Sequence, residues 1–188
     1  SGKVSASAPV TEDFPLDSGN LYGATKVANE HILGAIADLA GFDLIILRPA
    51  GVFGPGHYRG GSTVGIVMND LVAGAKRGEA VRIKESLLGT NEYVYAKDVA
   101  QAIEKACVVT SVKSRAFNVG TGKLYSAQEI VRKVCEQIPD ARVELAPPEP
   151  GEKVKRLRQP LDISRARSEL GYQPEYSMET ALADYIKA

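Results

Sequence analysis

A tyrosine and a lysine four residues apart, Tyr22 and Lys26, are the pair in this sequence best suited to chemistry. On a helix, side chains at this spacing project from the same face. A phenol is almost fully protonated at neutral pH, and an ammonium group beside it favours the phenolate. Such a pair can take a proton from a substrate hydroxyl or return one to a carbonyl oxygen. Taken alone, the Y-x-x-x-K spacing equally fits an ordinary surface tyrosine and lysine.

A long helix must carry this pair. Small and apolar residues recur at helical spacing from Ala28 to Leu39, and Gly41 suits the position just past a helix end, so we predict a helix over Leu21–Ala40. Leu44–Leu47 is predicted to be a buried strand that stops before Pro49, because proline disfavours helix in the residue before it. The segments 6–19 and 51–61, rich in glycine, proline and polar residues, are predicted to be loops.

The rest of the chain alternates between strand and helix patterns. Helices are predicted after a Ser62 cap, around 99–106 and behind the Ser126–Glu129 capping box, with two short ones at the end of the chain. Strands are predicted at 81–83, 92–95, 116–119 and 143–145, and a proline-rich connector at 147–160. This alternation predicts an α/β layered fold, in which the second half resembles a lid or a substrate-binding lobe.

The composition excludes several classes of protein. The chain has 188 residues, 23 basic and 23 acidic, so its formal net charge is zero and gives no electrostatic case for a nucleic-acid or membrane partner. The 44% of hydrophobic residues is typical of a globular domain. Two cysteines provide neither a disulfide framework nor a thiolate metal site, and we expect no metal. Each cysteine falls in a helical pattern and is expected in the core. No apolar run is long enough to span a membrane, and no targeting leader is evident.

Five motifs follow one another in a set order. They are Y-G-A-T-K at 22–26, R-P-A-G-V-F-G-P-G at 48–56, E-Y-V-Y-A-K-D-V-A at 92–100, F-N-V-G-T-G at 117–122, and D-I-S-R-A with L-G-Y-Q-P at 162–166 and 170–174. In this order and spacing the set resembles the NAD-dependent epimerase/dehydratase family of the extended short-chain dehydrogenase/reductase superfamily. The resemblance covers nearly the whole chain, and the five motifs together are specific where one alone is not.

The resemblance implies a fold and a set of roles. The fold would be α/β, part of a Rossmann-like doubly wound parallel sheet (1–60 and parts of 92–125) with a small α/β substrate-binding lobe (61–91 and 126–188). Tyr22 resembles the catalytic tyrosine and Lys26 the lysine that holds the nicotinamide ribose. Pro49 and Ala50 resemble the backbone beside the nicotinamide, and Ser1 is a candidate for polarising the substrate oxygen. The cofactor would be NAD, or NADP, and the substrate a sugar or nucleotide-sugar. A cytoplasmic enzyme that dimerises through the tyrosine helix is the corresponding expectation.

One family feature is missing from the sequence. Members bind the dinucleotide through a glycine-rich G-x-x-G-x-x-G or G-x-G-x-x-G turn. Neither Gly54-Pro55-Gly56 nor Gly120-Thr121-Gly122 has a glycine at the third position, and we interpret both as tight turns after strands. We therefore expect this chain to be the C-terminal part of an enzyme with roughly 100 further residues before Ser1.

The substrate side departs from the family as well. Nucleotide-sugar epimerases usually have an arginine at the position of Asn91, where it would meet the diphosphate, and asparagine cannot replace that cation. The basic residues of the connector (Lys153, Lys155, Arg156, Arg158) could compensate, or form a solvated surface. A dehydrogenase or reductase of a smaller alcohol or ketone, and a chain that is inactive on its own, are the alternatives. His57 could line a substrate pocket, and Asp98 is expected to cap its helix.

Overall fold

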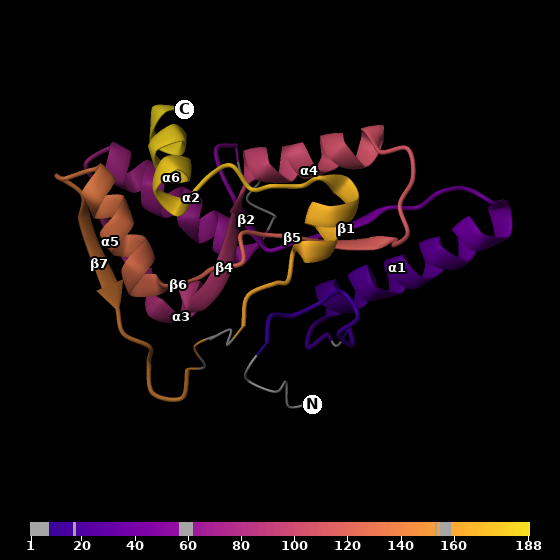
Figure 1. The fold of residues 1–188 in the computed structure, drawn as a ribbon. Coiled ribbons are helices and arrows are strands. Elements are labelled where there is room, and N and C mark those ends of the chain that lie inside the picture. Colours follow the sequence, from indigo (N-terminus) through magenta and orange to yellow (C-terminus); the bar gives the residue numbers. More distant parts are fainter. Residues whose placement is uncertain (1–7, 17, 57–61, 153, 155–158) are drawn as a thin grey trace.

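A computed structural model gives the fold of the chain and describes residues 8–16, 18–56, 62–152, 154 and 159–188 (Figure 1). The helices are α1 (Leu21–Ala40), α2 (Thr63–Lys76), α3 (Glu85–Leu88), α4 (Ala96–Val108), α5 (Ala127–Gln137) and α6 (Met178–Lys187), with a π-helical turn at Ala166–Leu170. The strands are β1 (Ile46–Pro49), β2 (Gly51–Phe53), β3 (Ala80–Lys84), β4 (Thr90–Tyr95), β5 (Ala116–Val119), β6 (Leu124–Ser126) and β7 (Arg142–Ala146). The α/β class predicted from the sequence is confirmed.

Most strand pairs are parallel, and the chain changes its pairing partner at Ala50. Before this residue β1 pairs with β5, and after it β2 pairs with β4, both in parallel. The Ala50 N–H still donates to the carbonyl of Val119 at 2.9 Å, so the change of partner takes place within one residue. The β3–β7 pair is also parallel, and β6 runs antiparallel to β4. Ligands of open α/β sheets bind at the carboxyl ends of the strands, and β1 ends at Pro49, next to this change of partner.

Two apolar cores lie on either side of β4. Tyr93 and Tyr95 belong to the core built mainly by α2, α5 and α6, whereas Val94 between them belongs to the core that contains Phe117 of β5. Side chains along a strand alternate between its faces, so one strand can serve both cores. Burial of these large side chains is the main contribution to the stability of both parts.

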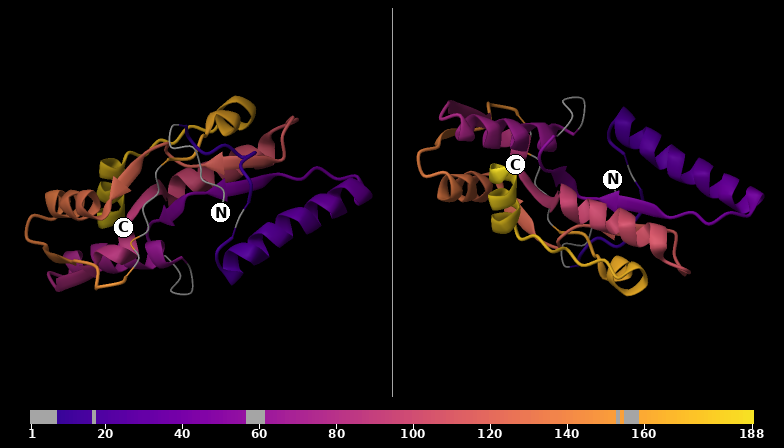
Figure 2. Two further views of the ribbon diagram at one scale, coloured as in Figure 1. Left: turned by 90° about the horizontal axis from the view of Figure 1, so that it is seen from below. Right: turned by 90° about the horizontal axis from the view of Figure 1, so that it is seen from above.

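Helix α1 lies apart from the other helices. Figure 2 shows it along one side of the molecule, while α4 runs on the opposite side of the β1–β5 pair. Of the 20 described residues of α1, Ala37 is the one that is buried. The stripe of Ile32, Ile36 and Leu39 faces solvent, although such spacing usually marks a buried face.

The predicted elements agree with the structure in kind and differ at their ends. The helix over Leu21–Ala40, the Ser62 cap, the Ser126–Glu129 capping box and the strand over 116–119 are all confirmed. Strand β1 begins two residues later than predicted, and β2 lies in a segment predicted to be a loop. Short elements such as β2, β6 and α3 have too few residues to show a hydrophobic period.

Two predictions about side chains are wrong. Asp98 does not cap its own helix; its Oδ1 accepts from the N–H of Glu175 at 2.8 Å, and so ties the C-terminal connection to α4. Cys107 is exposed near the end of α4 and Cys135 is partly buried, so neither is a core thiol; both are free. A helix able to cross a bilayer, by length and apolar character, is not found in the part of the chain that the structure describes.

Candidate active site

The start of α1 is fixed by a capping network, and this network places the predicted tyrosine. The side-chain oxygen of Asn20 accepts from the N–H of Gly23 at 2.8 Å, and the Ser18 hydroxyl donates to the Asn20 carbonyl at 2.7 Å. Caps of this kind satisfy the free amides of the first turn. Tyr22 is 72% exposed, and the Lys26 ammonium lies 5.4 Å from the centre of its ring. The structure thus brings the two predicted partners together.

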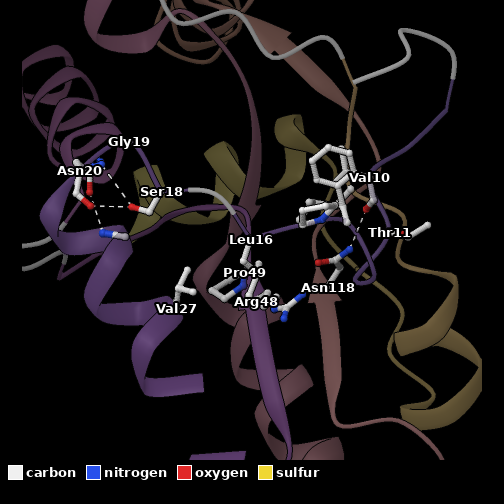
Figure 3. Close-up of a pocket in the computed structure, with 14 residues that line it drawn as sticks. Val10, Thr11, Leu16, Ser18, Gly19, Asn20, Val27, Arg48, Pro49 and Asn118 are labelled. Atoms are coloured by element: carbon white, nitrogen blue, oxygen red, sulfur yellow. Dashed lines mark hydrogen bonds between the residues drawn. The ribbon is translucent and has the colours of Figure 1, made fainter. Parts of the chain in front are cut away.

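A first cavity of about 500 Å³ opens beside this helix start (Figure 3). Its wall comes from the 10–20 segment, α1, the end of β1, Asn118 of β5 and Leu161. Figure 3 shows Arg48 and Pro49 between Val27 of α1 and Asn118. The cavity therefore lies between α1 and the β1–β5 pair.

A second cavity, of about 600 Å³, has Tyr22 itself in its wall. Pro49, Ala50 and Leu161 line it together with the start of α2, so Pro49 and Leu161 border both cavities. Three of the predicted site residues, Tyr22, Pro49 and Ala50, thus meet at one cavity, at the point where the strand changes its partner. Lys26 is one helical turn from Tyr22. Ser1 and His57 lie outside the described residues.

A buried carboxylate stands in the wall of the second cavity. Glu92 is 3% exposed, and its two oxygens accept from the backbone N–H groups of Thr121, Gly122 and Leu161 at 2.7, 2.9 and 2.6 Å. Burial raises the pKa of this carboxyl, while the three N–H donors oppose the shift. Two N–H groups of the Gly120-Thr121-Gly122 segment donate to the Glu92 side chain. This agrees with the interpretation of the segment as a tight turn and not as a phosphate-binding loop.

Among the described lining residues of the second cavity, the acidic and basic side chains are limited to Glu92. Asn91, at the position of the expected arginine, is buried in the wall, and its amide donates to the Leu88 carbonyl. The described lining residues include no lysine or arginine. No cluster of three or more His, Cys, Asp or Glu that could hold a metal ion occurs among the described residues.

A chain of polar contacts that the sequence did not predict joins these elements. Arg48 binds the carboxylate of Glu30 on α1 and the backbone carbonyl of Glu12. Glu12 is buried and accepts from the Asn118 N–H at 2.7 Å, and the Asn118 amide donates to the Val10 carbonyl at 2.9 Å. A carboxylate in a loop has no hydrophobic period that could reveal it; the arginine directly before Pro49 is the one usable sequence signal.

Comparison with known proteins identifies the family. The sequence model of the NAD dependent epimerase/dehydratase family matches residues 1–120. The chain belongs to this family. A curated member, UDP-glucose 4-epimerase of Mycolicibacterium smegmatis, is 32% identical over 183 residues, which are 95% of this chain and 56% of the relative. The epimerase/dehydratase chain therefore spans about half the length of the curated relatives it matches.

Solved structures agree with this family membership. UDP-glucose 4-epimerase of Thermotoga maritima, solved with UDP-glucose, has a TM-score of 0.77 at 27% identity, covering 96% of this chain and 56% of that protein. ADP-L-glycero-D-manno-heptose-6-epimerase of Helicobacter pylori gives a TM-score of 0.77 at 26% identity, with 96% and 54% covered. UDP-glucose 4-epimerase of Thermus thermophilus, solved with NAD, gives 0.75 at 25% identity, with 96% and 57% covered. The family resemblance and the fold predicted from the motifs are confirmed.

Proposed function

We propose that this chain supplies the proton-transfer half of an NAD-dependent epimerase or dehydratase acting on a sugar or nucleotide-sugar. The observation that carries the proposal is the position of Tyr22 in the cavity wall with Pro49 and Ala50, and with Lys26 beside its ring. Family membership and relatives named as UDP-glucose and other sugar epimerases support the substrate class. Because the chain spans about half of those relatives, the activity belongs to the longer protein.

The residues fit one end of a dinucleotide and not the other. A phenol and an ammonium group beside a cavity wall made of Pro49 and Ala50 suit a nicotinamide ribose. The described chain has no glycine-rich cradle for the diphosphate, since the amides of the 120–122 turn bind Glu92. When bound, NAD supplies the hydride acceptor and donor. The division of the chain into a Rossmann-type part and a substrate-binding lobe belongs to this proposal. The core of α2, α5 and α6 supports it in part, whereas Ile163, Ala166 and Tyr172, predicted to be in the lobe, pack in the core of Phe117.

In this mechanism the Tyr22 oxygen takes the proton of a substrate hydroxyl as the carbonyl forms, and returns a proton when the carbonyl is reduced. The Lys26 ammonium stabilises negative charge on that oxygen and holds the ribose. Ser1, outside the described residues, would donate to the same substrate oxygen.

A second candidate function keeps the scaffold and changes the substrate. The described lining around Asn91 includes no lysine or arginine, which supports a smaller alcohol or ketone, because a diphosphate is best held by a bidentate cation. In that case NAD or NADP would serve a net dehydrogenase or reductase. Screening UDP-sugars against simple ketones, with either cofactor, distinguishes the two functions.

Two further properties belong to the proposal. The exposed apolar side chains of α1 support a homodimer formed through this helix. A cytoplasmic location fits a chain whose described helices include none that could cross a membrane.

The decisive test is Tyr22→Phe in the longest natural form of the protein. Removal of the hydroxyl deletes the proton-transfer group, so turnover should fall by about 100-fold or more, while NAD affinity changes little. Tyr176→Phe is the matched control, since this tyrosine lines neither cavity. Steady-state rates and calorimetric titration with NAD measure both effects. Full activity of Tyr22→Phe would refute the mechanism. Calorimetric titration of the 188-residue chain with NAD shows whether this chain alone binds the cofactor.

A further inference from the structure

The helix that carries Tyr22 and Lys26 has little apolar anchoring. Ala37 is the one buried residue among its described residues, and large side chains such as Ile32 and Leu39 are exposed. In proteins most helical stability comes from packing of an apolar face. The position of Tyr22 relative to the Pro49–Ala50 wall must therefore depend on other contacts.

Arg48 and Glu30 provide the strongest of these contacts. The Arg48 Nε donates to the two Glu30 carboxylate oxygens at 3.2 and 3.1 Å, and its Nη2 donates to Oε2 at 2.6 Å. The remaining Nη1 donates to the Glu12 carbonyl at 2.8 Å. The two side chains are only 21% and 20% exposed. A fork of this kind fixes both direction and distance, which a single point charge does not.

The sequence positions of the pair connect it to the site. Tyr22, Lys26 and Glu30 follow one another at intervals of four, so they occupy successive turns along one side of α1. Arg48 directly precedes Pro49, which borders both cavities. The pair thus joins the helix of the proposed acid/base group to the strand that forms the cavity wall.

We propose that Arg48 and Glu30 are positioning residues that hold the Tyr22–Lys26 helix at working distance from the Pro49–Ala50 wall. The expected effect on catalysis rests on the proposed function. The contact between Arg48 and Glu30, called the clamp below, is a property of the fold alone. A second ion pair on the same helix, between Asp38 and Arg115, provides the contrast. Its side chains are 65% and 47% exposed, and such surface pairs contribute little.

The test compares Glu30→Gln with Arg115→Met in the longest natural form of the protein. Glu30→Gln keeps the size of the side chain and removes the charged fork, and Arg115→Met breaks the exposed pair. Hydrogen exchange of the α1 amides, measured without substrate, should quicken about tenfold in Glu30→Gln and stay unchanged in Arg115→Met. Equal exchange in the two variants would overturn the clamp whatever the activity of the protein.

Turnover of the same variants is the second measurement. A small misplacement of reacting groups can lower a rate by about 100-fold, so kcat per bound NAD should fall in Glu30→Gln with KM little changed. Arg48→Lys, which keeps the charge but not the fork, should recover only part of the rate lost in Arg48→Met. A purely structural role would lower the number of NAD-binding sites and leave kcat per site intact, which would refute positioning. An inactive parent protein would refute the proposed function, and the exchange measurement would still decide the clamp.

Discussion

Helices α1 and α2 are held in the molecule in opposite ways. Of the 14 residues of α2, seven are buried, among them Met68, Leu71 and Val72 at the centre of a core. Helix α1 is longer, at 20 residues, yet it buries only Ala37 of its described residues, and its strongest contact is the ion pair of Glu30 with Arg48. The helix with the proposed chemistry is thus the one with the least packing.

The contrast between α1 and α2 shows that an apolar stripe in a helical sequence does not predict whether that face is buried within the same chain. The period of α1 is that of an amphipathic helix, but its large apolar residues face outward and Gly23, Val27 and Glu30 face the cavity and β1. The side toward the body carries small and polar residues, which allow close approach and hydrogen bonding. Packing supplies stability in α2, whereas specific polar geometry supplies orientation in α1.

The largest effect expected from this contrast comes from truncating a side chain in each helix. Leu71→Ala leaves a cavity in a closed core and should lower the free energy of unfolding by about 2–5 kcal/mol. In the monomer, Leu39→Ala removes a side chain that is exposed to water and should change the free energy of unfolding by less than about 0.5 kcal/mol. Urea unfolding of the two variants measures the difference. A loss in Leu39→Ala as large as in Leu71→Ala would mean that the outer face of α1 is packed in solution.

Substitution of a glycine in each helix should give effects of opposite sign. A Cβ at Gly74 of α2 would lie 2.5 Å from Cγ2 of Val81, so Gly74→Ala should destabilise the fold by about 1–3 kcal/mol. A Cβ at Gly34 of α1 meets no described atom within 4 Å, so Gly34→Ala should stabilise it by about 0.5–1 kcal/mol through helix propensity. Thermal unfolding shows the direction of both shifts. The same sign in both variants would remove the distinction between the helices.

The smallest expected effect is on the pH dependence of stability. It concerns the Glu92 carboxyl group, which is buried, whereas the ion pairs of α1 are partly or largely exposed. The pKa of Glu92 in the fold is raised above its ordinary value by burial, so folding takes up a proton between the unfolded and the folded pKa. Its contribution is therefore present below the unfolded pKa and is lost as the pH rises through the folded pKa. Glu92→Gln should flatten this part of the stability curve, measured by urea unfolding across the acidic range. An unchanged slope would show that the carboxylate is ionised throughout.

The sequence predicted the helices and most strands better than it predicted their contacts with one another. Helix caps such as Ser62 and Ser126 act through neighbours two or three residues away, so local sequence was enough to predict them. The strand β2 owes its existence to pairing with β4, some forty residues later in the chain, and no local signal announces it. The hydrogen bond of the Asp98 carboxylate could not be predicted for the same reason, because its donor is the backbone N–H of Glu175, far away in the sequence.

In the candidate site, too, local sequence motifs predicted some residues and missed those defined by contacts between distant elements. Tyr22, Lys26, Pro49 and Ala50 were predicted from ordered motifs, and the structure brings Tyr22, Pro49 and Ala50 to one cavity. Glu12 and Glu30 were missed because their partners, Asn118 and Arg48, come from other elements. Ordered motifs in the sequence suggested the proposed acid/base pair, whereas the proposed positioning residues are defined by tertiary contacts.

The pairing of Val10 with Leu161 has a consequence for the order of assembly on the ribosome. The Val10 N–H donates to the Pro160 carbonyl at 2.8 Å, and the Val10 carbonyl accepts from the Asp162 N–H at 2.9 Å, so one wall of the first cavity joins two segments far apart in the sequence. Contacts between residues so distant in sequence are slow to form, and synthesis proceeds from the N-terminus. The pairing of Val10 can therefore form only after residues 160–162 have been synthesised, later than the contacts of Glu12 with Arg48 and Asn118, so this edge of the first cavity forms after its other walls.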